Sequence, residues 1–306
     1  MTIRFDDRVA IVTGAGNGLG RSHALGLAAR GARVVVNDVG GSRDGSGASS
    51  DAAVGVVEEI LAGGGDAIAD GADVTDNDQV EAMVLRAIDR WERVDILVNN
   101  AGIIRDKSFL KMDLEDFFKV VAVHLEGSVH CTKAVWEVMR DQGYGRIAMT
   151  TSSSGLYGNF GQANYGAAKM ALVGLMNTLV LEGGKYDIRV NTLAPCAATR
   201  MTEDLMKPEL LDLLAPEAVT AGLLYLVSEN APNRAVLAAG AGTFARAVLY
   251  ETPGFHLAAE DCTPEGVAAH WEEITSSAGQ AEYRSGADQT VNLLTKAAQN
   301  LGLDLG

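Results

Sequence analysis

Three side chains could together remove the hydroxyl proton of an alcohol. Tyr165 stands four residues before Lys169 in a segment with helical periodicity, so both side chains project from one face of a helix. An ammonium beside a phenol favours the phenolate and lowers the tyrosine pKa from about 10 toward neutrality. Ser152, thirteen residues before Tyr165, follows a strand-like run and could hold a substrate oxygen by a hydrogen bond. A Tyr-x-x-x-Lys pair alone is also an ordinary surface helix pair, so this chemistry requires a cofactor site nearby.

A glycine-rich turn follows the first strand-like run and opens a helix. Glycines there permit a tight turn, let the backbone approach a pyrophosphate and aim the helix N-terminus at its charge. A lone glycine cluster can also be a plain turn from strand to helix. Its position after a β-branched run favours a dinucleotide site, with these candidate contacts: Gly14, Gly16, Asn17, Gly18, Leu19 and Gly20.

An acidic residue, Asp38, ends the second strand-like run, about 20 residues after the glycine turn. A carboxylate there can accept hydrogen bonds from an adenosine 2'-hydroxyl, and it repels a 2'-phosphate. Val39 rather than arginine follows it, so the sequence favours NAD over NADP. Arg43 is the side chain that a folded loop could still bring to a 2'-phosphate. The alternative is that Asp38 merely ends a strand.

The next two strand ends carry further candidate contacts. Asp73 and Val74 follow the third strand and could meet an adenine edge with a carboxylate and a backbone N–H, although the pair is also an ordinary turn. Asn99 and Ala101 stand at the end of the fourth strand, where open α/β sheets place their ligands. We expect them beside the nicotinamide ribose. The amides of Asn99 and its neighbour Asn100 could also tie neighbouring strands together, and both interpretations can hold at once.

These motifs require strands and helices in alternation, and the chain shows that pattern. Short β-branched runs alternate with helix-length segments, which predicts βαβ units and a Rossmann-type, doubly wound parallel sheet of seven strands with helices on both faces. The expected strands cover residues 8–13, 33–37, 67–70, 95–99, 146–151, 189–193 and 235–238. The expected helices cover residues 19–29, 51–62, 76–91, 113–140, 164–182 and 216–228.

The character of the chain changes after Pro253. Thr263 can cap a helix that has Pro264 in its first turn and runs to about residue 275, and residues 290–301 suggest another helix. We expect a catalytic Rossmann domain over residues 1–252 and a helical C-terminal extension over residues 253–306 that packs on it.

Composition excludes several classes of function. The net charge of −15 disfavours nucleic acid or an anionic membrane as a partner. The five histidines and three cysteines show no metal-ligand spacing, so we expect no metal. No apolar run approaches the roughly 20 residues of a membrane span, and the charged first eight residues lead straight into a strand. A cytoplasmic location is expected.

In order and spacing, the motifs resemble the short-chain dehydrogenase/reductase family over about residues 8–250. The resemblance implies pyrophosphate contacts at Gly14, Gly18 and Gly20, adenosine contacts at Asp38, Asp73 and Val74, and nicotinamide contacts at Asn99 and Ala101. It makes Ser152, Tyr165 and Lys169 the catalytic trio, the last two also lying against the cofactor.

Two positions depart from the family pattern. His124, in VAVHLEG, replaces the asparagine that completes a water-linked proton relay through Lys169. Histidine can also bond a carbonyl and water and titrates near neutrality, so His124 either replaces the relay residue or is a buried packing residue. Pro195-Cys196 replaces the usual Pro-Gly, and Pro195 and Thr199 are the expected contacts on the nicotinamide side, Thr199 at its carboxamide.

A narrower resemblance is to the 3-hydroxyacyl-CoA dehydrogenase domain of peroxisomal multifunctional enzymes, carried by NNAGIIRDKSF, VHLEG and SGLYGNFGQANYGAAK. TPEGVAAHWEEI is similar to the extension of those domains. The resemblance implies NAD-dependent oxidation of a (3R)-hydroxyacyl-CoA, including sterol side-chain thioesters, by a homodimer or homotetramer. Alternatives are a 3-oxoacyl carrier protein reductase using NADPH, a 17-hydroxysteroid dehydrogenase and an NAD-binding regulator. A polyanionic CoA ester needs a basic rim, for which the candidates are Arg105, Lys107, Lys111, Arg200 and Lys207.

Overall fold

Eight strands form one sheet in the computed structural model, which describes residues 2–42, 44–47, 51–197 and 212–303. Their order is β3-β2-β1-β4-β5-β6-β7-β8, and all neighbours from β3 to β7 are parallel. The predicted parallel seven-stranded sheet is confirmed, with one strand more. The strands are β1 Val9–Thr13, β2 Arg33–Asn37, β3 Asp66–Asp70, β4 Ile96–Asn99, β5 Gly145–Thr150, β6 Ile188–Cys196, β7 Val236–Gly240 and β8 Thr243–Ala247.

The eighth strand, β8, is the addition that the sequence did not predict. Ala241 and Gly242 alone connect β7 to β8, with φ of 49° and 71°. Left-handed φ at both residues suits the tight turns of two-residue hairpins. Most of β8 is exposed, so it lacks the apolar run by which the buried strands were recognised.

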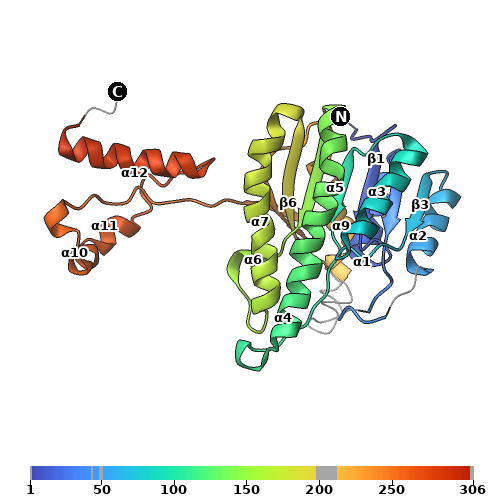
Figure 1. The fold of residues 1–306 in the computed structure, drawn as a ribbon, viewed down its shortest axis with the longest axis horizontal. Coiled ribbons are helices and arrows are strands. Elements are labelled where there is room, and N and C mark those ends of the chain that lie inside the picture. The colour runs from blue at the N-terminus through green and yellow to red at the C-terminus, as the bar shows by residue number, and fades with distance from the viewer. Residues whose placement is uncertain (1, 43, 48–50, 198–211, 304–306) are drawn as a thin grey trace. The chain divides into compact units, whose positions relative to one another are not determined.

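Helices cover both faces of the sheet, as expected. Helix α1 packs against α2 and α9, while α3 packs against α5 and α4 against α7 (Figure 1). The helices of this part of the chain are α1 Gly18–Ala28, α2 Asp51–Ala62, α3 Asn77–Trp91, α4 Leu114–Val121, α5 Gly127–Gln142, α6 Ser153–Tyr157, α7 Ala163–Gly183 and α9 Pro216–Leu226.

The expected continuous helix over residues 113–140 is interrupted. A π-helical turn, Ala122–Glu126, lies between α4 and α5 and contains His124. Such insertions widen one turn of a helix and are frequent at functional sites. Apolar periodicity continues through the insertion, so the sequence pattern alone predicted one helix. The five-residue helix α6 was also not predicted, because it is too short to show periodicity.

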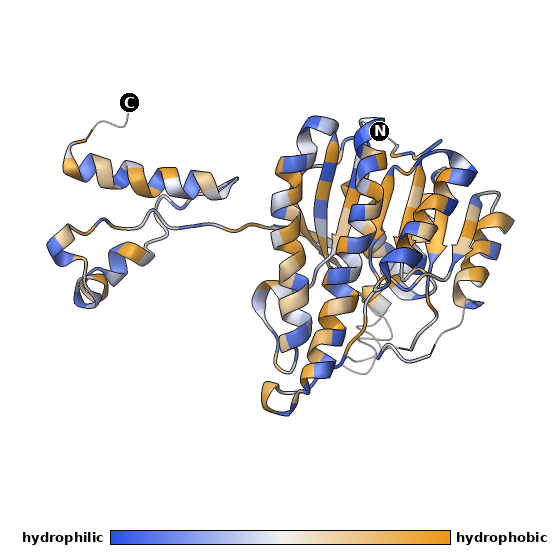
Figure 2. Cartoon of the chain, viewed as in Figure 1, coloured by the Kyte–Doolittle hydropathy of each residue, from blue (hydrophilic) through white to orange (hydrophobic). Residues whose placement is uncertain are grey.

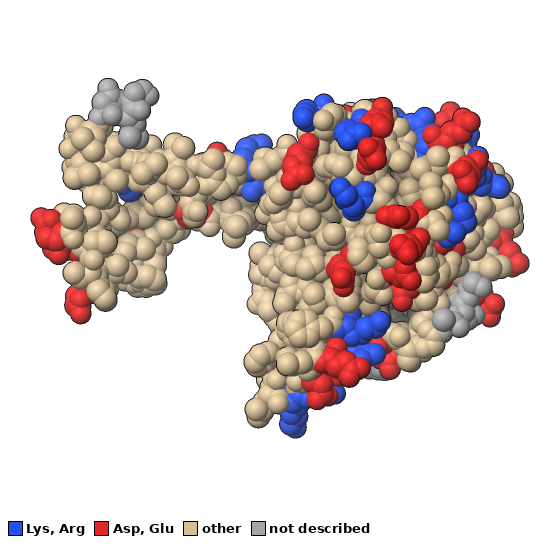
Figure 3. All heavy atoms as spheres, viewed as in Figure 1, with Lys and Arg blue, Asp and Glu red and all other residues tan. Residues whose placement is uncertain are grey.

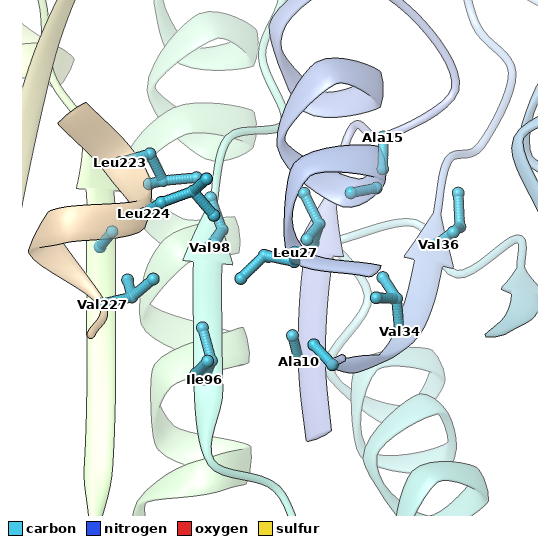
Figure 4. Close-up of a cluster of buried hydrophobic side chains, with 14 of the residues drawn as sticks. Ala10, Ala15, Leu27, Val34, Val36, Ile96, Val98, Leu223, Leu224 and Val227 are labelled. Atoms are coloured by element: carbon cyan, nitrogen blue, oxygen red, sulfur yellow. The ribbon is translucent and has the colours of Figure 1, made fainter. Parts of the chain in front are cut away.

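A hydrophobic core between the sheet and the α1–α9 layer holds the strand ends in place. Ala10, Val36 and Val98 from three strands meet Leu27 of α1 and Leu223 of α9, all fully buried (Figure 4). The sheet strands are correspondingly apolar in Figure 2. Fully burying one such side chain stabilises the fold by about 1.5–3 kcal/mol, so this layer anchors α1 behind the glycine turn.

The chain divides into two compact units, Met1–Arg246 and Ala247–Gly306. In the second unit, Thr263 caps α10 Pro264–Ala269 as predicted, accepting from the Gly266 N–H. The helix expected to reach residue 275 breaks at His270, and α11 Trp271–Thr275 follows. Helix α12 Gly286–Leu301 starts earlier than predicted, because Ser285 and Asp288 form a capping box. The domain limits at residues 252 and 253 and the packing of the extension stay predictions.

None of the helices in the described ranges is long and apolar enough to cross a membrane.

Candidate active site

The carboxyl ends of the parallel strands lie level with one another and form the floor of a cavity. Thr13 of β1 is in register with Asn37 of β2, and Thr150 of β5 is in register with Leu193 of β6. The cavity beside these ends has a volume of about 240 Å³. Of the predicted site residues, it is lined by Gly14, Asn17, Gly18, Leu19, Gly20, Asp38, Asp73, Val74, Ala101, His124, Tyr165, Lys169 and Pro195.

The glycine turn has a backbone that other residues would strain. Gly14 and Gly18 have φ of 62° and 53°, in the left-handed region. A Cβ on Gly14 would lie 2.8 Å from the Ala101 Cα, and one on Gly20 would overlap the Gly14 carbonyl oxygen. The turn delivers the N-terminus of α1, which has no acidic residue in its first turn, to the cavity wall. This cradle suits a pyrophosphate.

Asp38 is held rigidly at the far end of this cradle. Its Oδ2 accepts from the Gly16 N–H at 2.8 Å and its Oδ1 accepts from the Gly40 N–H at 2.7 Å. A Cβ on Gly16 would lie 2.8 Å from Asp38 Oδ2, so Gly16 leaves room for the carboxylate and does not itself line the cavity. The negative charge fits an adenosine ribose and opposes a 2'-phosphate. Arg43 lies outside the described residues.

The predicted adenine contacts, Asp73 and Val74, line the cavity but also serve local structure. The Asp73 carboxylate accepts from the Thr75 N–H at 2.9 Å and from its hydroxyl at 2.8 Å. The Val74 carbonyl lies 3.0 Å from Nδ1 of His130. Both the turn and the adenine interpretation are compatible with this geometry, so the adenine contact stays a prediction.

At the end of β4, a residue beside the predicted ones holds the glycine turn. The Asn100 amide donates to the carbonyls of Thr13 and Gly14 at 3.0 and 3.1 Å. Asn99 instead donates to Thr132 at 3.0 Å and does not line the cavity, while its buried Oδ1 has no partner among the described residues. Asn100 therefore ties β4 to the cradle, the structural task that the sequence suggested for both asparagines. The predicted carboxamide contact, Thr199, lies outside the described residues.

The predicted acid–base residues come together at the other end of the cavity. Tyr165 and Lys169 lie one turn apart on α7, with the Lys169 Nζ 5.5 Å from the centre of the Tyr165 ring. The ammonium donates to the Thr150 carbonyl at 2.5 Å. Ser152 follows β5 and caps α6, its hydroxyl accepting from the Ser154 N–H at 3.2 Å, and it lies close enough to Tyr165 to lower the pKa of the phenol by hydrogen bonding.

The charge state of this trio differs from the expectation. Burial raises the pKa of the Tyr165 phenol, the Ser152 hydrogen bond lowers it and the nearby Asp106 raises it. Burial also lowers the pKa of Lys169 to about 7. The expectation that Lys169 brings the tyrosine pKa down is wrong for the protein's own groups, because the ammonium is itself buried and only partly charged near neutrality. A cationic nicotinamide ring beside the phenol would act in the lowering direction.

His124 is held edge-on to Tyr165, with the ring centres 5.1 Å apart. Its Nε2 lies 3.1 Å from the Ile103 N and 2.8 Å from the Ile103 carbonyl oxygen, while the buried Nδ1 has no partner in the described part of the chain. Burial and the Lys169 charge hold the His124 pKa well below its usual value, so the ring is neutral. A Cβ on Gly102 would overlap Cε1 of this ring. Sequence reasoning missed this pairing of glycine with histidine, which no spacing signals.

Two of the predicted rim cations are already paired. Arg105 binds Asp116 at 2.8 Å and the Asp44 carbonyl at 2.9 Å, and Lys107 binds Asp113 and Asp116 at 3.0 and 2.9 Å. Figure 3 shows basic and acidic side chains interspersed on the face in view. The carboxylates on and next to α4 thus offset both charges. Lys111 ends a short 3-10 helix, Phe109–Lys111, and Arg200 and Lys207 lie outside the described residues.

Residues 8–210 match the family described as short chain dehydrogenase. The chain belongs to this family. A short-chain type dehydrogenase/reductase of Mycobacterium tuberculosis is 50% identical over 276 residues, which cover 89% of this chain and 96% of that protein. The chain is thus an oxidoreductase that acts on hydroxyl groups and depends on a nucleotide cofactor.

Two solved structures extend the likeness. Full-length peroxisomal multifunctional enzyme type 2 from Drosophila melanogaster has a TM-score of 0.81 and 36% identity, covering 98% of this chain. This chain spans only about half of that one, 51%. A 7α-hydroxysteroid dehydrogenase complexed with NADH and 7-oxo glycochenodeoxycholic acid has a TM-score of 0.70 and 32% identity, covering 78% of this chain and 95% of that one.

Proposed function

We propose that this protein oxidises a (3R)-hydroxyacyl-CoA to the 3-oxoacyl-CoA with NAD, with sterol side-chain thioesters among its substrates. The observation that carries the proposal is one cavity that holds Asp38 at one end and Tyr165 and Lys169 at the other. The substrate class is supported by the likeness to the multifunctional enzyme, which covers 98% of this chain and so includes the C-terminal unit. The likeness to the hydroxysteroid dehydrogenase covers less of this chain, 78%.

The residues present fit a bound NAD. Gly14, Gly18 and Gly20 would hold the pyrophosphate and Asp38 the adenosine ribose, because the first three form a cradle without side chains and the fourth is a fixed acceptor. The predicted nicotinamide contacts are Asn99, Ala101, Pro195, Thr199, Tyr165 and Lys169. The chemistry supplied by the bound nicotinamide is acceptance of a hydride.

The protein's own groups manage the proton. Ser152 donates a hydrogen bond to the substrate oxygen and holds it beside Tyr165. The Tyr165 phenolate takes the hydroxyl proton, and Lys169 stabilises that phenolate when protonated. His124 offers its unpartnered Nδ1 as the water-binding group of the relay that leads the proton away.

The competing functions make different demands. A 3-oxoacyl carrier protein reductase with NADPH would place a 2'-phosphate against Asp38, which the carboxylate opposes. A 17-hydroxysteroid dehydrogenase would turn over substrates without a thioester. A regulator that binds NAD without catalysis would have no need for Tyr165 and Lys169 to line the cavity with Ser152 beside them.

The test is reduction of NAD and of NADP by the purified protein with straight-chain and steroidal (3R)-hydroxyacyl-CoAs, beside free 17-hydroxysteroids. We expect turnover with the thioesters and NAD, and a kcat/KM for NADP at least about tenfold lower. No NAD reduction with any hydroxyacyl-CoA would overturn the proposed substrate. Faster turnover with NADPH and a 3-oxoacyl carrier protein would assign the reductase instead.

A homodimer or homotetramer and a cytoplasmic location complete the proposal. Phe118 on α4 and Leu181 on α7 are 63% and 59% exposed, on the helices where the family resemblance implies subunit contacts. Three unpaired thiols, Cys131, Cys196 and Cys262, suit a reducing compartment. Light scattering gives the mass in solution, and a monomer at micromolar concentration would contradict the assembly. Fractionation tests the location.

A further inference from the structure

Two loops beside the catalytic centre are joined at three points. The Lys107 N–H donates to the Gly161 carbonyl at 3.0 Å, and the Asn164 amide donates to the Arg105 carbonyl at 3.0 Å. Between these backbone contacts, the Gln162 Nε2 donates to the Asp106 Oδ2 at 2.7 Å. The loop after β4 and the loop before α7 are therefore held together as one layer, here called the wall, and Asp106 lies at the middle of its three contacts.

Asp106 determines which way the Gln162 amide faces. An ionised carboxylate only accepts hydrogen bonds, so the amide must present its NH₂ to Asp106 and its Oε1 to the opposite side. There Oε1 accepts from the Ser154 hydroxyl at 2.7 Å and from the Asn159 amide at 3.1 Å. A reversed amide would set its carbonyl against the carboxylate and its NH₂ against the Asn159 NH₂.

The chain of contacts reaches the catalytic serine. Ser154, held by Gln162, donates its backbone N–H to the Ser152 Oγ at 3.2 Å. The Ser152 hydroxyl in turn lowers the pKa of the Tyr165 phenol by hydrogen bonding. A surface carboxylate is thereby connected to the two groups that bind the substrate oxygen, through one amide, one hydroxyl and one backbone N–H.

We propose that Asp106 is a positioning residue of the catalytic centre, which fixes Gln162 and Ser154 around Ser152 and adds a negative charge beside Tyr165. This proposal rests on the assigned role of Tyr165 and names a residue that the family motifs did not supply. The charged and titratable groups that face Tyr165 are Lys169 from α7, His124 from the π-helical turn and Asp106 from the loop after β4. His124 is neutral, and Asp106 is the group whose charge raises the pKa of the phenol.

Asp106→Asn separates charge from position. The asparagine Oδ1 can still accept from Gln162, so the wall is retained while the negative charge is lost. Removing a negative charge favours the phenolate, so the pKa of Tyr165 falls. The acid limb of kcat/KM for alcohol oxidation moves to lower pH by about half a unit, because Asp106 is exposed and screened by solvent. Asp113→Asn, an exposed carboxylate of the same region paired with Lys107, is the matched control and leaves the limb in place.

Gln162→Leu tests position without changing charge. It breaks the connection between Asp106 and Ser154, so kcat falls about tenfold as Ser152 loses its fixed orientation, and the acid limb stays where it is. An acid limb that is the same in Asp106→Asn and in the unaltered protein would overturn the charge role. A kcat unchanged in Gln162→Leu would overturn the positioning role.

A readout without substrate separates this proposal from the proposed function. The ultraviolet difference spectrum between the protein and its Tyr165→Phe variant reports ionisation of that phenol alone during a pH titration. Asp106→Asn should shift this titration to lower pH even if no hydroxyacyl-CoA is turned over. Loss of acyl-CoA activity with the spectroscopic shift present would reject the substrate only, and turnover with no shift would reject the role of Asp106.

Discussion

The two ends of the cavity are built from different kinds of groups. At the adenosine end, Asp38 accepts hydrogen bonds from two backbone N–H groups and Asn100 ties the glycine turn to β4, so these two side chains are fixed by hydrogen bonds. At the reacting end, the His124 Nδ1 is buried without a partner in the described residues. Burial also raises the Tyr165 pKa and lowers that of Lys169.

The difference shows where binding and chemistry are separated. A fully bonded frame holds a ligand in one place and costs the fold little. Buried ionisable groups with shifted pKa values destabilise the fold, and they are retained where their protonation is used. Substitutions at the reacting end should therefore affect turnover more than cofactor binding, and the reverse should hold at the adenosine end.

The largest expected effect is at the reacting end. Tyr165→Phe removes the proton acceptor while keeping the ring against His124, so kcat should fall by about 10³-fold or more. The dissociation constant for NADH should change by less than about threefold, because the phenol adds little to the binding of the rest of the dinucleotide. Steady-state kinetics and NADH fluorescence give the two values. Tyr157→Phe, at a tyrosine 77% exposed, is the control, and similar turnover in both variants would refute the assignment.

Lys169 should destabilise the fold that it serves. Its pKa is about 7 in the folded protein against the ordinary lysine value of 10.5, so the unfolded chain binds more protons between these values. The cost is fully present below about pH 7 and disappears as the pH rises toward 10.5. Lys169→Met should then raise the unfolding free energy at pH 7 by a few kcal/mol, at about 1.4 kcal/mol per pKa unit, and lose activity.

Denaturant unfolding at pH 7 and at pH 10 measures this gain. The difference between Lys169→Met and the unaltered protein should shrink at the higher pH, because other titrating groups cancel in the comparison. A gain of equal size at both values would show that packing, and not the buried charge, is responsible.

At the adenosine end the expected effect is on cofactor choice. Asp38→Ala removes the acceptor for the ribose and the repulsion of a 2'-phosphate, so the ratio of kcat/KM for NAD to that for NADP should fall by about 10- to 100-fold. Most of the change should come from a lower kcat/KM for NAD, because the substitution adds no side chain that could bind the 2'-phosphate of NADP. Asp73→Asn is the control, because its predicted partner, the adenine, is the same in NAD and NADP, so the ratio should stay unchanged. An unchanged ratio in Asp38→Ala would remove the case for NAD.

Sequence reasoning predicted the adenosine end better, for a physical reason. A glycine turn between strand and helix and a carboxylate at a strand end are local features, so their places follow from the order of the elements. Tyr165 and Lys169 line the cavity and Ser152 lies beside Tyr165 without lining it, because parallel strand ends meet at one edge of the sheet.

Other features depend on which distant loops touch, and no local pattern carries that information. The direction of the Tyr165 pKa shift depends on burial by the whole domain. The Asp106–Gln162 bond joins residues 56 apart in the chain. The pairing of Gly102 with His124 depends on the π-helical turn that carries His124. The apolar periodicity of the sequence gives no sign of this turn, so the position of the ring could not be predicted.

That pairing gives the smallest and most local prediction. His124→Asn restores the residue usual in the family, and since His124 is already neutral, it should lower kcat by less than about tenfold without moving the pH profile.

Gly102→Ala should destabilise the protein by about 1–3 kcal/mol, because its Cβ would overlap the His124 ring and force the ring or its backbone to move. In the His124→Asn background the shorter side chain leaves room for that Cβ, so the cost of Gly102→Ala should fall. A double-mutant cycle measured by thermal unfolding gives the coupling, and additive effects would mean that the ring is free to move aside.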